Sequence, residues 1–74
     1  MSKEYNLPKD EIDNLIDQWI LDEKASEILR LRLFKNHTYE RIAEEVDMSE
    51  RHIPRIIDRN IKILFKHGLQ IIDS

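Results

Sequence analysis

Two helical patterns follow each other in residues 38–66 with almost no chain between them. In each, apolar residues recur at the i, i+3, i+4 spacing that marks one face of a helix. The first set is Tyr39, Ile42, Ala43 and Val46, and the second is Ile53, Ile56, Ile57, Ile61, Leu64 and Phe65. Thr38 and Ser49 precede the two patterns as natural N-caps, so only Asp47 and Met48 are left for the connection. An antiparallel hairpin needs more chain to turn back, and we therefore expect the two helices to cross steeply as a helix-turn-helix.

The residues around the predicted turn fit a close crossing. Ala43 is small enough to lie where two helix backbones approach each other, and Met48 has a flexible side chain that fills irregular space. Ile53 and Ile56 would close the same pocket from the second helix. The alternative interpretation is an ordinary pair of helices whose apolar stripes only form a core.

The outward face of the second helix argues against that alternative. It carries mostly basic side chains, namely Arg51, His52, Arg55, Arg59, Lys62 and Lys66, against the acids Glu50 and Asp58. A helix that needs only solubility usually mixes the two signs. The net charge of the chain is −3, yet residues 1–29 hold three lysines and eight acids, whereas residues 30–74 hold nine Lys or Arg and seven acids. Phosphate binding depends on the local field, so the sequence is compatible with modest affinity for DNA.

The remaining patterns predict an all-α fold, a compact domain of four to five helices that contains the helix-turn-helix from Thr38 to about Lys66. We expect a frayed N-terminus over 1–6, helices over 8–21, 22–35 and 38–47, a recognition helix over 49–67 and an apolar tail over 68–74. Asp22 is the expected N-cap of the second helix, and Asn36 and Gly68 tolerate the left-handed backbone that ends many helices.

Three further features of the sequence carry expectations. Trp19 is expected to anchor the first helix in the core. The first expected helix has an apolar stripe made of Ile12, Leu15, Ile16, Trp19 and Ile20. The acids opposite this stripe, among them Asp13 and Asp17, form either a solvated face or a face for a partner. The apolar tail, including Ile71 and Ile72, either packs on the core or binds a partner.

Several kinds of chemistry lack a signature in the sequence. The chain has no cysteine, no glycine-rich phosphate loop and no pattern of a catalytic nucleophile, so we predict neither an enzyme nor a cofactor. His37, His52 and His67 fall on different predicted elements, which argues against a shared metal site. No apolar run reaches the length of a membrane span, and we expect a cytoplasmic protein.

Two stretches of the chain resemble a known family. The run Leu29-Arg30-Leu31-Arg32-Leu33-Phe34, followed by T-Y-E-R-I-A-E-E-V-D-M-S-E-R-H-I, resembles region four of bacterial RNA polymerase sigma factors over about residues 22–66. Similar helix-turn-helix patterns occur in LuxR-type regulators and in small phage regulators of the ArpU type. The resemblance implies a DNA-binding domain that works in transcription.

The resemblance also implies which residues contact DNA. Carried over by position, they are Ser49, Glu50, Arg51, Pro54, Arg55 and Arg59. The chemistry is compatible, because arginine reads guanine and glutamate accepts from cytosine in the major groove. Lys62 and Thr38 are expected near phosphates, and His52 near either bases or phosphates.

The sequence departs from the family pattern at three positions. Asp47 stands where glycine is common, and Arg41 stands where a glutamate would complete a capping box with Thr38. Pro54 lies five residues after Ser49 and predicts a distorted first turn in the recognition helix.

Three functions remain open at this level. The first is a sequence-specific transcription regulator that binds double-stranded DNA, as a homodimer or together with RNA polymerase or another regulator. The second is a protein adaptor that binds polymerase or a regulator through the acidic first helix and the apolar tail. The third is a subunit for DNA packaging or replication.

Overall fold

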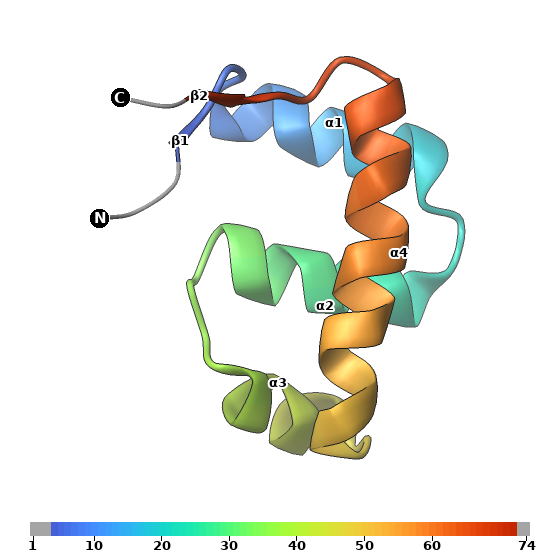
Figure 1. The fold of residues 1–74 in the computed structure, drawn as a ribbon. Coiled ribbons are helices and arrows are strands. Elements are labelled where there is room, and N and C mark those ends of the chain that lie inside the picture. Colours follow the sequence, from blue (N-terminus) through green and yellow to red (C-terminus); the bar gives the residue numbers. More distant parts are fainter. Residues whose placement is uncertain (1–3, 73–74) are drawn as a thin grey trace.

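The second of four α-helices lies in the middle of the domain, and the other three helices pack against it (Figure 1). The computed structural model describes residues 4–72. The helices are α1 (Lys9–Trp19), α2 (Glu23–Leu33), α3 (Tyr39–Val46) and α4 (Ile53–Lys66), with a 3-10 turn η1 (Glu50–His52) before α4. Two short strands, β1 (Glu4–Tyr5) and β2 (Ile71–Ile72), form an antiparallel ribbon. The expected all-α fold with a helix-turn-helix is confirmed.

Aliphatic side chains fill the space between the helices. The fully buried members come from every helix and from the segment after α4, and they are Ile16, Ile28, Leu29, Ile42, Ile53, Leu64 and Leu69. Each was part of an apolar pattern, which is why periodicity alone locates most of this core. Among residues 4–72, no helix combines the length and apolar character that a bilayer crossing requires.

Local signals set most helix ends as expected. The Asp22 carboxylate accepts hydrogen bonds from the backbone amides of Lys24 and Ala25 at 2.9 and 3.3 Å, so Asp22 caps α2. Asn36 has a left-handed backbone with φ of 58°, and Gly68 has φ of 116°. After α4 the Leu69 amide donates to the Leu64 carbonyl at 3.1 Å, a bond that commonly closes a helix at a left-handed residue.

The N-terminal segment is not frayed where the structure describes it, so the expectation for residues 1–6 was wrong over Glu4 to Asn6. Glu4 and Tyr5 pair with Ile72 and Ile71. The Asn6 side chain donates to the Gly68 carbonyl at 3.0 Å and accepts from the Gln70 amide at 2.7 Å. Residues 1–3 and 73–74 lie outside the described part.

The apolar residues of the tail differ in how far they are buried. Leu69 is 1% exposed and belongs to the core, whereas Ile71 and Ile72 keep 41% and 46% of their surface exposed while their backbone pairs with β1. Burial raises the pKa of the Tyr5 phenol, and the charge of Arg32 partly offsets that shift. The Tyr5 side chain of β1 is therefore within electrostatic reach of Arg32 on α2.

Trp19 is not buried in the core, so the expectation that it anchors the first helix there was wrong. Its side chain is 45% exposed and stacks on His67, with ring centroids 3.6 Å apart and planes 4° from parallel. Ile12 and Ile16 of α1 and the following Ile20 are buried, and Leu15 packs against them as a partly buried neighbour. The ring of Trp19 therefore joins the C-terminal ends of α1 and α4 from the outside.

An ion-pair cluster holds α1 against α2. The Arg30 guanidinium contacts Asp13 at 2.6 Å and Asp17 at 2.7 Å. The hydrogen bond to Asp13 raises the pKa of Arg30, although burial opposes the shift. Two of the acids on the outward face of α1 are thus engaged within the domain.

The contribution of the two Asn6 side-chain hydrogen bonds to stability can be tested by substitution. We expect Asn6→Ala to lower the free energy of unfolding by about 1 kcal/mol, because two hydrogen bonds to the segment after α4 are lost. Hydrogen exchange at the Gln70 amide should accelerate at the same time. Gln18→Ala, at an exposed position of α1, is the control. Equal stability and equal exchange in the two variants would show that these hydrogen bonds of Asn6 do not stabilise the fold.

Candidate DNA-binding surface

The turn between α3 and η1 has the geometry that a steep helix crossing needs. Asp47 adopts a left-handed conformation with φ of 56° and ψ of 53°. The Met48 amide then donates to the Ala43 carbonyl at 3.0 Å. Ala43 is 6% exposed and Ile53 is fully buried, and α3 packs against both η1 and α4. Asp47, which stands where glycine is common in the family, thus takes a backbone conformation that glycine adopts readily.

Two side chains from other elements support this crossing. The Lys24 ammonium donates to the Val46 carbonyl at 3.3 Å and so satisfies the end of α3. Arg32 donates to the His37 carbonyl at 2.9 Å and lies over the Tyr39 ring, 4.6 Å from its centroid. Sequence reasoning missed both residues, because their partners lie on other elements. Their only sequence signal is a basic residue near a helix end.

Thr38 caps α3 as expected. Its hydroxyl accepts a hydrogen bond from the Arg41 amide at 3.2 Å. The Arg41 side chain lies 3.8 Å from Glu45 and cannot complete a capping box. Glu45 also lies 3.8 Å from Nδ1 of His37, a buried nitrogen that has no hydrogen-bond partner among the described residues.

Ser49 occupies the cap position, but its side chain makes no capping hydrogen bond, so its predicted role as a side-chain cap was wrong. The chain first makes the 3-10 turn η1, with the His52 amide donating to the Ser49 carbonyl at 3.0 Å. The predicted continuous recognition helix over 49–67 is therefore η1 followed by α4.

Pro54 explains the change of helix type. Proline has no amide hydrogen, and in a continuous α-helix it would fail to bond the Glu50 carbonyl. Instead the Ile53 amide donates to Glu50, and α4 begins so that Pro54 lies in its first turn, where free amides are normal. The expected distortion of the first turn is confirmed.

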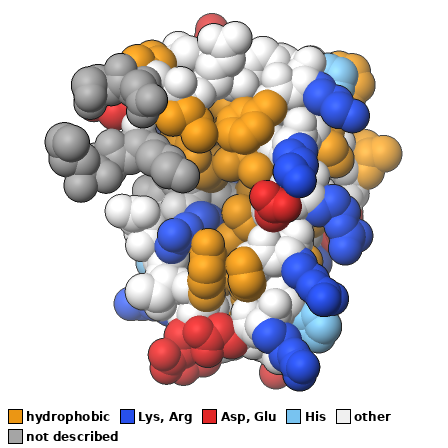
Figure 2. Space-filling view, viewed as in Figure 1, with side chains coloured by type: hydrophobic (Ala, Val, Ile, Leu, Met, Phe, Trp, Pro, Cys, Tyr) orange, Lys and Arg blue, Asp and Glu red, His pale blue; other side chains and the backbone are white. Residues whose placement is uncertain are grey.

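Most of the basic side chains of η1 and α4 share one exposed face. Arg55, Arg59, Lys62 and Lys66 follow the i, i+4, i+7, i+11 spacing of one helix face, opposite the buried side of α4. Figure 2 shows Lys and Arg side chains in a column along the edge where α4 runs in Figure 1. We name Arg51, Arg55, Arg59, Lys62 and Lys66 the basic stripe; all five are exposed.

Most of the other predicted site residues lie on or next to η1, at the N-terminal end of the basic stripe. Glu50, Arg51 and His52 are exposed on η1, Ser49 precedes them, and Pro54 is half-buried. Thr38 is exposed at the start of α3 and lies apart, in a shallow hollow with Glu40, Arg41, Glu44 and Glu45. The structure thus groups the residues from Ser49 to Lys62 and adds Lys66, which the predicted contact set omitted.

One acid interrupts the stripe. Asp58 lies 3.2 Å from Lys62, with both side chains about two-thirds exposed. Such an exposed pair contributes little to stability, so Lys62 can leave Asp58 for a stronger anion. A shallow groove of about 470 Å³ runs along Arg55, Arg59, Lys62, Ile63 and Lys66 beside this pair.

The fold and this surface define a helix-turn-helix domain of the kind that binds DNA. The family described as sigma-70, region 4 matches residues 20–66, and the chain belongs to this family. Searches of curated proteins and of solved structures gave no significant match. Region 4 domains bind DNA and are not enzymes, which gives the general function of this chain.

The backbone at Asp47 leads to a prediction on stability. A left-handed conformation strains residues with a β-carbon and is least favourable for branched ones. We expect Asp47→Gly to be as stable as the parent or up to about 1 kcal/mol more stable, and Asp47→Val to be about 1–2 kcal/mol less stable. Urea unfolding measures both. Equal stability of the valine and glycine variants would contradict a left-handed turn.

Proposed function

We propose that this domain is a sequence-specific regulator of transcription that places η1 and the start of α4 in the major groove of DNA. The observation that carries the proposal is the basic stripe, which runs on one exposed face directly after a helix-turn-helix crossing. In other helix-turn-helix proteins, the N-terminal part of the second helix contacts bases while the first helix crosses the backbone.

The length of the helix divides the stripe into two parts. The fourteen residues of α4 span about 21 Å, whereas the major groove is about 12 Å wide. Only the first turns can therefore reach base edges. We expect Arg51 and Arg55 to read guanine and Glu50 to accept from cytosine. Arg59, Lys62 and Lys66 then lie near phosphates, as do Ser49 and Thr38, while His52 lies at the boundary.

A single copy offers few base contacts, so useful specificity requires a larger assembly. RNA polymerase is the partner that region 4 membership supports for this chain, with another regulator as the second choice. The adaptor hypothesis has lost part of its support, because Asp13 and Asp17 already pair with Arg30 and the backbone of Ile71 and Ile72 already pairs with β1.

The roles of the stripe can be separated by two substitutions at one position. We expect Arg55→Ala to weaken binding to a selected cognate site by about 1–3 kcal/mol and to relax base preference there. Arg55→Lys is the matched control, because it keeps the charge but loses the planar two-donor geometry. It should retain binding to random duplex DNA and lose preference for the cognate site.

A salt series completes this measurement. Lys62→Ala should weaken binding to all sequences alike and lower the slope of log K against log salt by about 1. If Arg55→Ala binds the cognate site as tightly as the parent, the major-groove assignment is wrong. If the parent binds no duplex even at low salt, the proposed function fails as a whole.

Acidic side chains on α3 should limit non-specific binding. Glu40 and Glu44 are exposed beside Thr38, on the helix that would cross the DNA backbone. We expect Glu44→Gln to raise affinity for random duplex DNA about two- to fivefold, because repulsion of phosphates is relieved. Glu11→Gln, an exposed position on α1, is the control and should leave affinity unchanged. Equal affinities of the two variants would place α3 away from the backbone.

A further inference from the structure

Asp58 is the only acidic residue of α4, and it lies among the side chains of the basic stripe. It follows Arg55 by three residues and precedes Lys62 by four, so it shares the exposed side of the helix with both. All three side chains line the shallow groove of about 470 Å³. The Asp58 carboxylate is about two-thirds exposed, and it therefore meets whatever ligand this groove receives.

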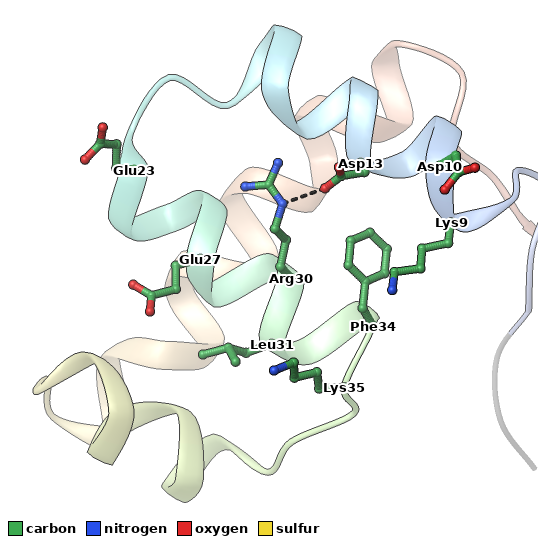
Figure 3. Close-up of a pocket in the computed structure, with 9 residues that line it drawn as sticks. All are labelled: Lys9, Asp10, Asp13, Glu23, Glu27, Arg30, Leu31, Phe34 and Lys35. Atoms are coloured by element: carbon green, nitrogen blue, oxygen red, sulfur yellow. Dashed lines mark hydrogen bonds and ion pairs between the residues drawn. The ribbon is translucent and has the colours of Figure 1, made fainter.

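The pairing of Asp58 differs from that of the acids on α1. Asp13 is held from another helix by Arg30 at 2.6 Å, and the Arg30 side chain is only 33% exposed (Figure 3). Asp58 instead pairs within its own helix with Lys62 at 3.2 Å, and both side chains are largely exposed. Within residues 4–72 this is the one ion pair of Asp58. A pair of this kind contributes little to stability, so the fold does not depend on it.

Binding of DNA removes the partner of Asp58. In the proposed function Lys62 binds a phosphate, and it then no longer neutralises the carboxylate. An ionised carboxylate has only acceptor atoms, so a phosphate cannot satisfy it and repels it instead. Only a hydrogen-bond donor on the DNA can take the place of Lys62. In the major groove, such donors are the exocyclic amines of the bases.

The position of Asp58 along α4 is compatible with a contact to a base. Asp58 comes five residues after Ile53, where α4 begins, which corresponds to about 7.5 Å of helix. Lys62 lies about 13.5 Å from the same point. Because the major groove is about 12 Å wide, Asp58 falls within the part of the helix that can enter the groove, and Lys62 falls beyond it.

Cytosine is the base that best fits a carboxylate. In the major groove it presents the N4 amine, which donates, and no acceptor of its own beside that amine. Adenine also presents an amine, but its N7 acceptor lies next to the amine and repels a carboxylate. A site with cytosine opposite Asp58 therefore satisfies the carboxylate, whereas other bases leave it unpaired among phosphates.

We propose that Asp58 is a specificity-determining residue, which accepts a hydrogen bond from a cytosine amine at the cognate site and repels DNA that lacks this amine. This role rests on the proposed function and adds to it a particular base and a penalty for its absence. Selectivity of this kind uses an unpaired charge against the wrong partner as well as a contact with the right one. Arg55 and Asp58 are about 4.5 Å apart along the helix axis, so the base pairs that they read lie one or two steps apart, at about 3.4 Å per step.

Three substitutions separate the charge of Asp58 from its geometry. Asp58→Asn removes the charge at constant size and should raise affinity for random duplex DNA about two- to fivefold, because repulsion of phosphates is relieved. Asp58→Glu keeps the charge but moves the carboxylate by one methylene group, so it should bind random DNA like the parent and prefer cytosine less. Asp10→Asn makes the first change at an exposed position of α1, beside the groove in Figure 3, and should alter neither property.

Selection of binding sites from a library of random duplexes gives the decisive readout. The site selected by the parent should contain a position where cytosine is preferred at least about fivefold, next to or one step beyond the position that Arg55→Ala relaxes. Asp58→Asn should lose this preference and keep the others. Misfolding would lower every affinity together, so the expected gain for random DNA excludes it, and circular dichroism of each variant supports the comparison.

Two outcomes would overturn the role of Asp58 while the proposed function stands. In the first, the parent selects a site, and Asp58→Asn selects the same site with unchanged affinities. In the second, Asp58→Asn binds selected and random duplexes more tightly by the same factor, which would make Asp58 a source of general repulsion that reads no base. A parent that selects no site at all contradicts the proposed function itself, and the role of Asp58 falls with it.

Discussion

The short connection between α3 and η1 is the constraint on which the functional surface depends. With Asp47 in the left-handed region, the chain turns within two residues and the next helix can only leave α3 at a steep angle. Ala43 permits the close approach, and Lys24 binds the carbonyl that the end of α3 exposes. Pro54 then sets where α4 begins. The direction of the basic stripe follows from these backbone choices rather than from the stripe itself.

The distribution of charge matters more here than its sum. The chain carries a net charge of −3, yet the basic side chains of α4 share one exposed face while two acids of α1 pair with Arg30. Fields at a protein surface decay within about 10 Å at 0.1 M salt, so acids at the far end of the domain repel DNA only weakly. The nearby acids of α3 are the ones that oppose phosphate contact, and they favour binding that depends on base contacts.

Sequence reasoning reached the parts of the structure that depend on neighbours along the chain. Apolar periodicity located the helices, and the caps at Asp22 and Thr38 and the left-handed residues Asn36, Asp47 and Gly68 follow from local chemistry. The ribbon, the Trp19–His67 stack and the Arg30 cluster were missed, because each joins segments that only the fold brings together. Trp19 shows the limit best: its place in an apolar stripe does not tell whether the stripe extends past the edge of the core. Contacts with bases form only in a complex with DNA, so the roles of Arg51 and Arg55 stay predictions.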